Sequence, residues 1–229
     1  MNIRYVSVAI IVLLLAGGAW WYTTQNALYP FELVGGDTIS SWDFKGAYTG
    51  NTELEAKARA NIERLNGMFG SEGNTDYIIY ISIANEYSLL GDGAKEYEYL
   101  RRALAEDSTE TGLAWYDLAV LLTRLGAFES ARVAHEHAIQ AQPESQYVTA
   151  YLEFMTQHFS DDTEAVEKTF VDIKTLFGEH ATLSEIRARW LEKTGRIKEA
   201  IAEWRNVLIL SPGSASAVNV EIRRLEGEL

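Results

Sequence analysis

Apolar residues recur along most of the chain at steps of three and four positions, which is the spacing of one face of an α-helix. The clearest example begins at Gly112, where Trp115, Leu118 and Leu122 share one face of a predicted helix. Gly126 follows this run, and glycine commonly ends a helix because it tolerates a left-handed backbone conformation. The pattern predicts a short amphipathic helix that buries one face and stops at a tight turn.

A second helix is predicted directly after this turn. Ala131, His135 and Ala138 keep the helical spacing, and small alanines allow two helices to approach closely, while Pro143 stops the helix. In these residues the stretch 112–145 resembles the tetratricopeptide repeat, a pair of antiparallel helices. His135 stands where that repeat usually carries an aromatic residue.

Weaker copies of the same pattern flank this pair. They predict helix pairs over residues 76–108 and 146–178, and a fourth pair in which Ile186, Trp190 and Leu191 lead to Gly195 and the second helix runs to Pro212. Gly91, Gly126 and Gly195 lie 35 and 69 residues apart (126 − 91 and 195 − 126), so the longer gap has room for one more unit of the same length. The resemblance implies an all-α fold, in which residues 76–214 form a right-handed α-solenoid of about four helix pairs.

A further helix is predicted at each end of these pairs. Residues 52–75 combine an apolar stripe with Thr52 and Glu55, a capping-box spacing, which indicates an N-terminal cap helix. Residues 215–229 carry one narrow apolar face among charged residues, which is typical of the helix that closes a repeat array.

The N-terminal segment has a different pattern. Residues 6–22 contain no charge, and together with Ile3–Tyr5 they would form a helix of roughly 30 Å, the thickness of the hydrocarbon layer. Arg4 and the amino terminus carry the nearby positive charge, so residues 1–5 are predicted to form a cytoplasmic stub. We expect a single-pass anchor in the inner membrane, with the repeats on the extracytoplasmic side. The alternative is a cleaved signal peptide, with small residues at Gly17–Ala19.

Residues 23–51 are predicted to form an irregular linker, because Pro30 and several glycines break any periodicity. This linker carries five aromatic residues after Tyr22, which is more than a spacer needs. We therefore expect part of it to pack on the repeats. The alternative is that residues 42–48 form an exposed recognition segment.

The composition of the chain argues against several classes of function. The chain has 33 acidic and 20 basic residues, a formal charge of −13, and such a surface repels a phosphate backbone, so we expect no nucleic-acid partner. For the same reason, membrane contact should depend on hydrophobic insertion rather than on a basic patch. The absence of cysteine excludes disulfides, thiolate metal sites and cysteine nucleophiles.

No pattern that supports catalysis was found. His135 and His137 are two positions apart and diverge on a helix, so they cannot share a metal ion, and residues 160–164 lack the alternating ligands of a calcium loop. Phosphate-binding, hydrolase and zinc-protease motifs are absent from the sequence. We expect no metal, no cofactor and no enzyme activity. A site completed only by a partner is the remaining catalytic alternative.

The resemblance also implies a binding surface, since the first helix of each pair lines the concave side of such arrays. We transferred the groove-facing positions to this chain. The candidate binding residues are Ile81, Asn85, Tyr116, Val120, Arg124, Tyr147, Tyr151, Phe154 and Arg189. This largely apolar and aromatic strip would suit an extended peptide or an amphipathic helix. The alternative is that the strip is core, buried by the aromatic linker or by self-association.

Two functional hypotheses follow. The first is a non-catalytic, membrane-tethered scaffold or chaperone-like adaptor that binds a protein or peptide through the groove. The second is a structural subunit of a membrane-anchored assembly that uses the repeats to self-associate. The fold supports either, because function depends on the surface and not on the architecture.

Overall fold

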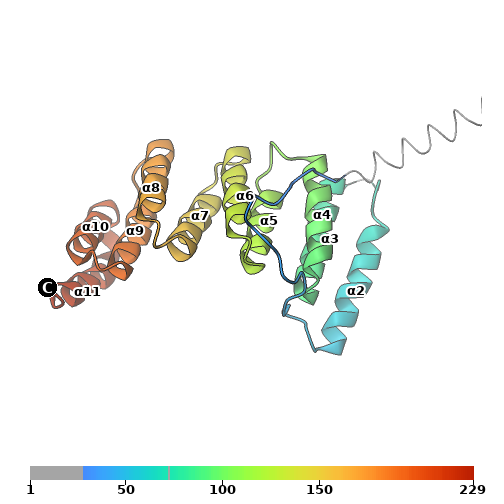
Figure 1. The fold of residues 1–229 in the computed structure, drawn as a ribbon, viewed down its shortest axis with the longest axis horizontal. Coiled ribbons are helices and arrows are strands. Elements are labelled where there is room, and N and C mark those ends of the chain that lie inside the picture. The colour runs from blue at the N-terminus through green and yellow to red at the C-terminus, as the bar shows by residue number, and fades with distance from the viewer. Residues whose placement is uncertain (1–27, 72) are drawn as a thin grey trace, which may run out of the picture. The chain divides into compact units, whose positions relative to one another are not determined.

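A computed structural model describes residues 28–71 and 73–229 (Figure 1). These residues contain ten α-helices and no β-strand, which confirms the all-α prediction for this part of the chain. The helices are α2 (Thr52–Asn66), α3 (Asp76–Leu90), α4 (Gly93–Glu106), α5 (Leu113–Arg124), α6 (Phe128–Ala141), α7 (Ser145–His158), α8 (Thr163–Phe177), α9 (Ala181–Lys193), α10 (Ile197–Leu210) and α11 (Ala215–Glu226), with a short 3₁₀ turn at Pro212–Ser214.

The described chain divides into two compact units. Unit 1 ends at Ala127 and contains α2 to α5, and unit 2 begins at Phe128 and contains α6 to α11. The boundary therefore falls inside the helix pair on which the repeat resemblance is clearest, between α5 and α6. Each unit is described by itself below.

In unit 1, the predicted cap helix packs on the first helix pair. Ile62 and Leu65 of α2 form a buried cluster with Ile79 and Ile83 of α3. The residue that caps α2 differs from the expectation, because Asn51, one position before Thr52, accepts the N–H of Leu54. Glu55 accepts a backbone N–H at the start of the helix, as a capping box requires, but the donor is Gly50, at 2.8 Å, and not Thr52.

Residues 29–48 form an extended segment, here called the strap, that lies along α4 (blue in Figure 1). At its start the Tyr29 N–H donates to the Arg101 carbonyl, and at its end the Tyr48 N–H donates to the Leu89 carbonyl, both at 2.9 Å. The linker therefore packs on the helices, as expected. The Trp42 ring lies 4.9 Å from that of Tyr97, so the alternative of an exposed recognition segment is not what the structure shows.

In unit 2, the helices are joined by buried tryptophans and by ion pairs. Trp190 of α9 is 1% exposed and Trp204 of α10 is 5% exposed. Arg187 of α9 contacts Glu167 of α8 at 2.8 Å and Glu203 of α10 at 2.6 Å. Because one guanidinium bridges three helices and is largely shielded, this network fixes α8, α9 and α10 better than isolated surface pairs would.

The predicted stub (1–5) and anchor (6–22), with the first residues of the linker, lie outside the described residues. Among the helices of residues 28–71 and 73–229, none combines the length and apolar composition that crossing a bilayer requires.

Two turn glycines provide a matched test of the strap. Gly91 and Gly126 both have φ near +80°, but a Cβ on Gly91 would lie 2.1 Å from the Phe44 carbonyl oxygen, whereas a Cβ on Gly126 would meet nothing within 4 Å. We expect Gly126→Ala to cost about 1 kcal/mol and Gly91→Ala about 2–3 kcal/mol, because only the latter must also displace the strap backbone. Denaturant unfolding of both variants checks this expectation, and equal losses would show that the strap is not held at Gly91.

Candidate binding groove

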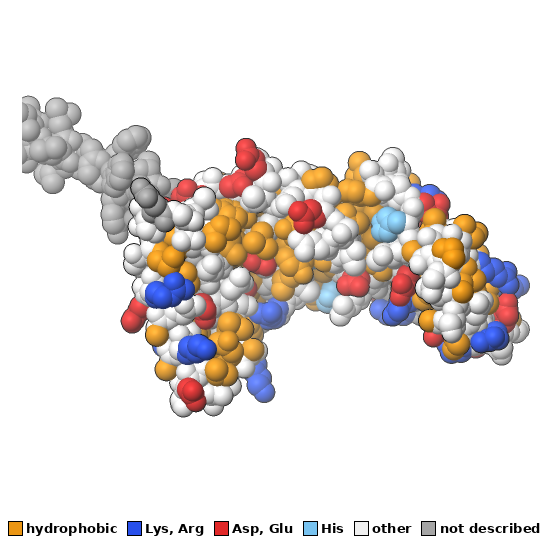
Figure 2. Space-filling view, turned by 180° about the vertical axis from the view of Figure 1, so that it is seen from behind, with side chains coloured by type: hydrophobic (Ala, Val, Ile, Leu, Met, Phe, Trp, Pro, Cys, Tyr) orange, Lys and Arg blue, Asp and Glu red, His pale blue; other side chains and the backbone are white. Residues whose placement is uncertain are grey.

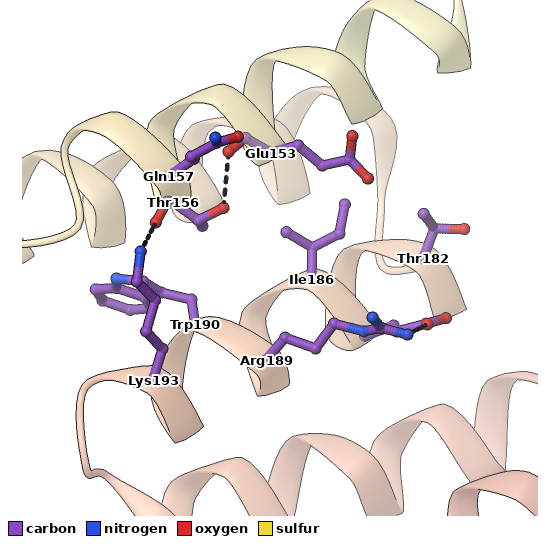
Figure 3. A pocket seen from close by; sticks show the side chains of 9 residues that line it. Glu153, Thr156, Gln157, Thr182, Ile186, Arg189, Trp190 and Lys193 are labelled. Carbon is purple, nitrogen blue, oxygen red and sulfur yellow. Dashed lines mark hydrogen bonds and ion pairs between the residues drawn. The ribbon is translucent and has the colours of Figure 1, made fainter.

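Unit 2 contains an open groove between α7 and α9, two helices that are in contact (Figure 3). Its volume is about 470 Å³. Side chains from both helices converge on it. The lining residues are Glu153, Thr156 and Gln157 of α7, and Thr182, Glu185, Ile186, Arg189, Trp190 and Lys193 of α9.

The groove has an apolar floor and a polar rim. Ile186 and Trp190 are 8% and 1% exposed, so they present only a small part of their surface. Arg189 forms an ion pair with Glu185 at 2.7 Å, and the Lys193 ammonium donates to the Thr156 carbonyl oxygen at 3.4 Å. Figure 3 shows the Lys193 contact, with Gln157 and Thr182 on opposite walls. Since two acidic and two basic side chains line the groove, it carries no net charge.

A second groove of about 370 Å³ continues from the first toward α11. Thr182, Glu185 and Arg189 line both grooves, so Arg189 stands where they join. Its guanidinium carbon lies 6.0 Å from the centre of the Trp204 ring. The indole N–H of Trp204 is buried without a hydrogen-bond partner, although the residue lines this second groove. A buried donor without a partner is costly, so a ligand carbonyl that reached it would gain a hydrogen bond.

The structure places the predicted binding residues of unit 2 in two different environments. Arg189 lines the groove as expected. Tyr147, Tyr151 and Phe154 are 2%, 8% and 5% exposed, and they form part of the core of unit 2. The Tyr151 hydroxyl donates to Glu136 of α6 at 2.9 Å, and the Phe154 ring lies 4.8 Å from that of His135. The three aromatic residues are therefore core and do not line the groove between α7 and α9, although Tyr151 also lines a separate pocket of about 310 Å³. The alternative that treated the strip as core expected the linker or a second copy to cover it, whereas Tyr151 and Phe154 contact α6.

The predicted residues of unit 1 are also divided. Ile81 is buried, Tyr116 and Val120 are half-buried, and Asn85 and Arg124 are exposed. Arg124 donates to the Ser88 hydroxyl at 3.0 Å and covers the Phe44 ring at 4.4 Å, so it contacts the strap.

The sequence interpretation missed the polar wall of the groove on α7. Thr156 and Gln157 follow Glu153 by three and four positions, so the three residues share one polar face of the helix. This polar face, in a helix that also carries buried aromatic residues, was the available signal.

Within residues 28–71 and 73–229 no group of histidine or acidic side chains has the arrangement of a metal site. On the face shown in Figure 2, acidic and basic side chains are interspersed with hydrophobic patches.

Comparisons with protein-family models and with curated proteins found no match to the chain.

Proposed function

We propose that this chain is a non-catalytic adaptor that binds a protein or peptide in the groove between α7 and α9. The observation that carries the proposal is the groove itself, which is open, lined by the first helices of two successive helix pairs, and polar above an apolar floor. Apolar contacts would supply affinity, and rim residues such as Gln157 and Arg189 would supply hydrogen bonds and register.

The finer architecture belongs to the same proposal. Helices joined by short glycine turns, a cap helix that packs on the first pair, and a polar last helix are features of a tetratricopeptide solenoid. The uncharged stretch 6–22 would tether this solenoid to the inner membrane with the repeats on the extracytoplasmic side. The adaptor would then recruit its partner to the membrane surface.

The second candidate is a structural subunit that self-associates. Its support is the exposed apolar surface of unit 2 outside the groove, since Val171 and Leu176 of α8 are 60% and 70% exposed. Two copies could bury such side chains against each other.

Photo-crosslinking from defined positions separates these candidates. A photoreactive amino acid replaces Gln157 or Thr182, which line the groove, or Lys174, an exposed residue of α8 that does not. In membranes of the native host we expect positions 157 and 182, but not 174, to form one discrete adduct with another protein. The adduct is then identified and the partner purified.

The purified partner provides the quantitative test. Arg189→Glu should weaken its binding by about tenfold or more, because a rim cation in contact with the ligand is reversed, whereas Lys174→Glu should leave the affinity unchanged. Adducts of twice the chain mass, formed from position 174 and absent from position 157, would instead support the structural subunit and contradict the adaptor.

A further inference from the structure

A buried carboxyl group lies in the first turn of α4, next to the strap. Glu96 is 4% exposed, and its Oε2 atom has no hydrogen-bond partner. The nearest cationic atom is Nη1 of Arg124, 4.0 Å away. At this position the tetratricopeptide pattern has a small alanine, so the acid is not required for helix packing. An ionised carboxylate in such a site would lack most of the solvation that water provides.

A second acid, the half-buried Asp117 of α5, lies close enough for its charge to act on Glu96. Asp117 has a buried Oδ2 atom without a hydrogen-bond partner. Burial raises the pKa of Glu96 to about 7, and the pKa of Asp117 to about 6. The other groups that act on Glu96 are Arg124 of α5 and the Ser88 hydroxyl of α3, which lower its pKa, while the Asp117 charge raises it. Burial raises the pKa of the Tyr77 hydroxyl of α3, and the charge of Asp117 raises it slightly more, so Tyr77 is a further group that senses Asp117.

The strap closes the end of α4 that carries Glu96. The Gly93 N–H donates to the Trp42 carbonyl at 3.0 Å, and the Phe44 N–H donates to the Gly91 carbonyl at 3.1 Å. A Cβ on Gly93 would lie 3.2 Å from the Phe44 ring, which shows how closely that ring covers the first turn. The guanidinium carbon of Arg124 lies 4.4 Å from the centre of the same ring. Arg124 is thus shared between Phe44, Ser88 and the buried acid.

We propose that residues 42–48 of the strap form a proton-controlled cover, which stays seated while Glu96 and Asp117 are protonated and is released when they ionise. Ionised Glu96 needs either water or a closer cation. Water can reach the Glu96 carboxylate only if the Phe44 ring moves away from the first turn of α4. Arg124 can come closer to Glu96 only by leaving the Phe44 ring. Both changes weaken the contact between Arg124 and Phe44 that helps to hold the strap.

The direction of the effect follows from linkage. The seated state holds Glu96 with a pKa above its ordinary value of 4.5, so the stabilisation of the seated state is complete below about pH 4.5 and is lost as the pH rises through about 7. Release therefore becomes more favourable between these two values, by at most about tenfold per pH unit for one carboxyl group.

Hydrogen exchange on the full chain, kept in solution with a non-ionic detergent, tests the proposal. The Phe44 and Tyr48 amides report on strap seating, because they donate to the Gly91 and Leu89 carbonyls. After correction for intrinsic exchange rates, their protection should fall about tenfold or more between pH 5 and pH 7.5. Protection of the Ile83 amide in the middle of α3 should stay unchanged. In Glu96→Gln, a neutral side chain of the same size, strap protection should depend on pH much less than in the parent and keep only the part that Asp117 contributes, while the exposed-site control Glu110→Gln should behave like the parent.

Three results would overturn the proposal. The first is a parent chain whose strap protection does not change with pH. The second is equal loss of protection at Ile83, which would mean general unfolding of unit 1. The third is a Glu96→Gln chain that retains the full pH dependence of the parent. Because the first two are read on the parent chain, they decide the question even if the variant folds poorly.

Discussion

Replacing Trp115 with alanine should lower the free energy of unfolding of unit 1 by about 3–5 kcal/mol, the cost of removing a fully buried aromatic side chain. Trp115 is 1% exposed. Its ring forms T-shaped contacts with the rings of Tyr29 and Phe31 of the strap, at centroid distances of 5.3 and 5.8 Å. Its indole N–H donates to the Ser108 carbonyl at 2.9 Å. The substitution thus leaves a cavity, removes the hydrogen bond to the Ser108 carbonyl, and removes the ring against which Tyr29 and Phe31 of the strap pack.

The control for this substitution is the next residue of the same helix. Tyr116 is half-buried, and Tyr116→Ala should cost about 1 kcal/mol, the typical effect of a partly exposed site. Denaturant unfolding followed by circular dichroism, with hydrogen exchange of α3 amides to assign the transition to unit 1, gives both values. Similar losses for the two variants would contradict the central role assigned to Trp115.

Unit 2 should lose about 3 kcal/mol of stability as the pH falls from 6.5 to 4, because His135 must remain neutral in the folded state. His135 is 3% exposed and lies against the rings of Tyr151 and Phe154. Burial, with a smaller contribution from the nearby His158, lowers its pKa from 6.5 to about 4. Since the folded-state pKa lies below the unfolded value, the contribution is complete above pH 6.5 and is lost as the pH falls through about 4.

His135→Phe tests this assignment, since it supplies the aromatic ring that the repeat pattern has at this position and removes the titrating group. The variant should show about 3 kcal/mol less acid destabilisation than the parent, measured by denaturant unfolding of unit 2 at a series of pH values. His137→Phe, two positions along the same helix, should keep the parental acid response. If the His135→Phe chain is as sensitive to acid as the parent, another group is responsible.

The helices were predictable because their signals are local. Gly91, Gly126 and Gly195 each adopt φ between +77° and +83°, a conformation that glycine tolerates and other residues rarely adopt. Each therefore marks the end of a helix in the sequence itself, and the periodic apolar residues between them define the helices. The buried position of His135 was also predictable, because its spacing matches that of the flanking alanines.

The groove was less predictable because it depends on contacts between distant segments. An aromatic residue such as Phe154 suits a binding surface and a core equally well, and its burial is decided by α6, which contributes His135. Only the polar spacing of Glu153 and Gln157 pointed to the open face of α7. Transferring groove positions from a family pattern placed Tyr147, Tyr151 and Phe154 on an open surface, whereas in unit 2 they are 2%, 8% and 5% exposed.

The docking of the strap was predictable from the sequence, but its position on the helices was not. Its aromatic content predicted that part of the linker would dock, because exposed aromatic side chains are costly in water. Its location along α4 was not predictable, since it is set by backbone hydrogen bonds to Gly91, Leu89 and Arg101 that any sequence could make.

The strap also constrains the order of events during synthesis. Its contacts with Tyr97 and Arg101 join residues 66 and 72 positions apart, and the strap leaves the ribosome before any of its partners exists. At 5–20 residues per second, the chain from α2 to the end of α5 takes roughly 4–15 s to make. Until α3 and α4 are made, the five aromatic side chains of the strap have no partner surface, and the part that Trp115 of α5 provides for Tyr29 and Phe31 is made last. A newly made chain is therefore most exposed to aggregation, and most in need of a chaperone, at the segment that later holds unit 1 together.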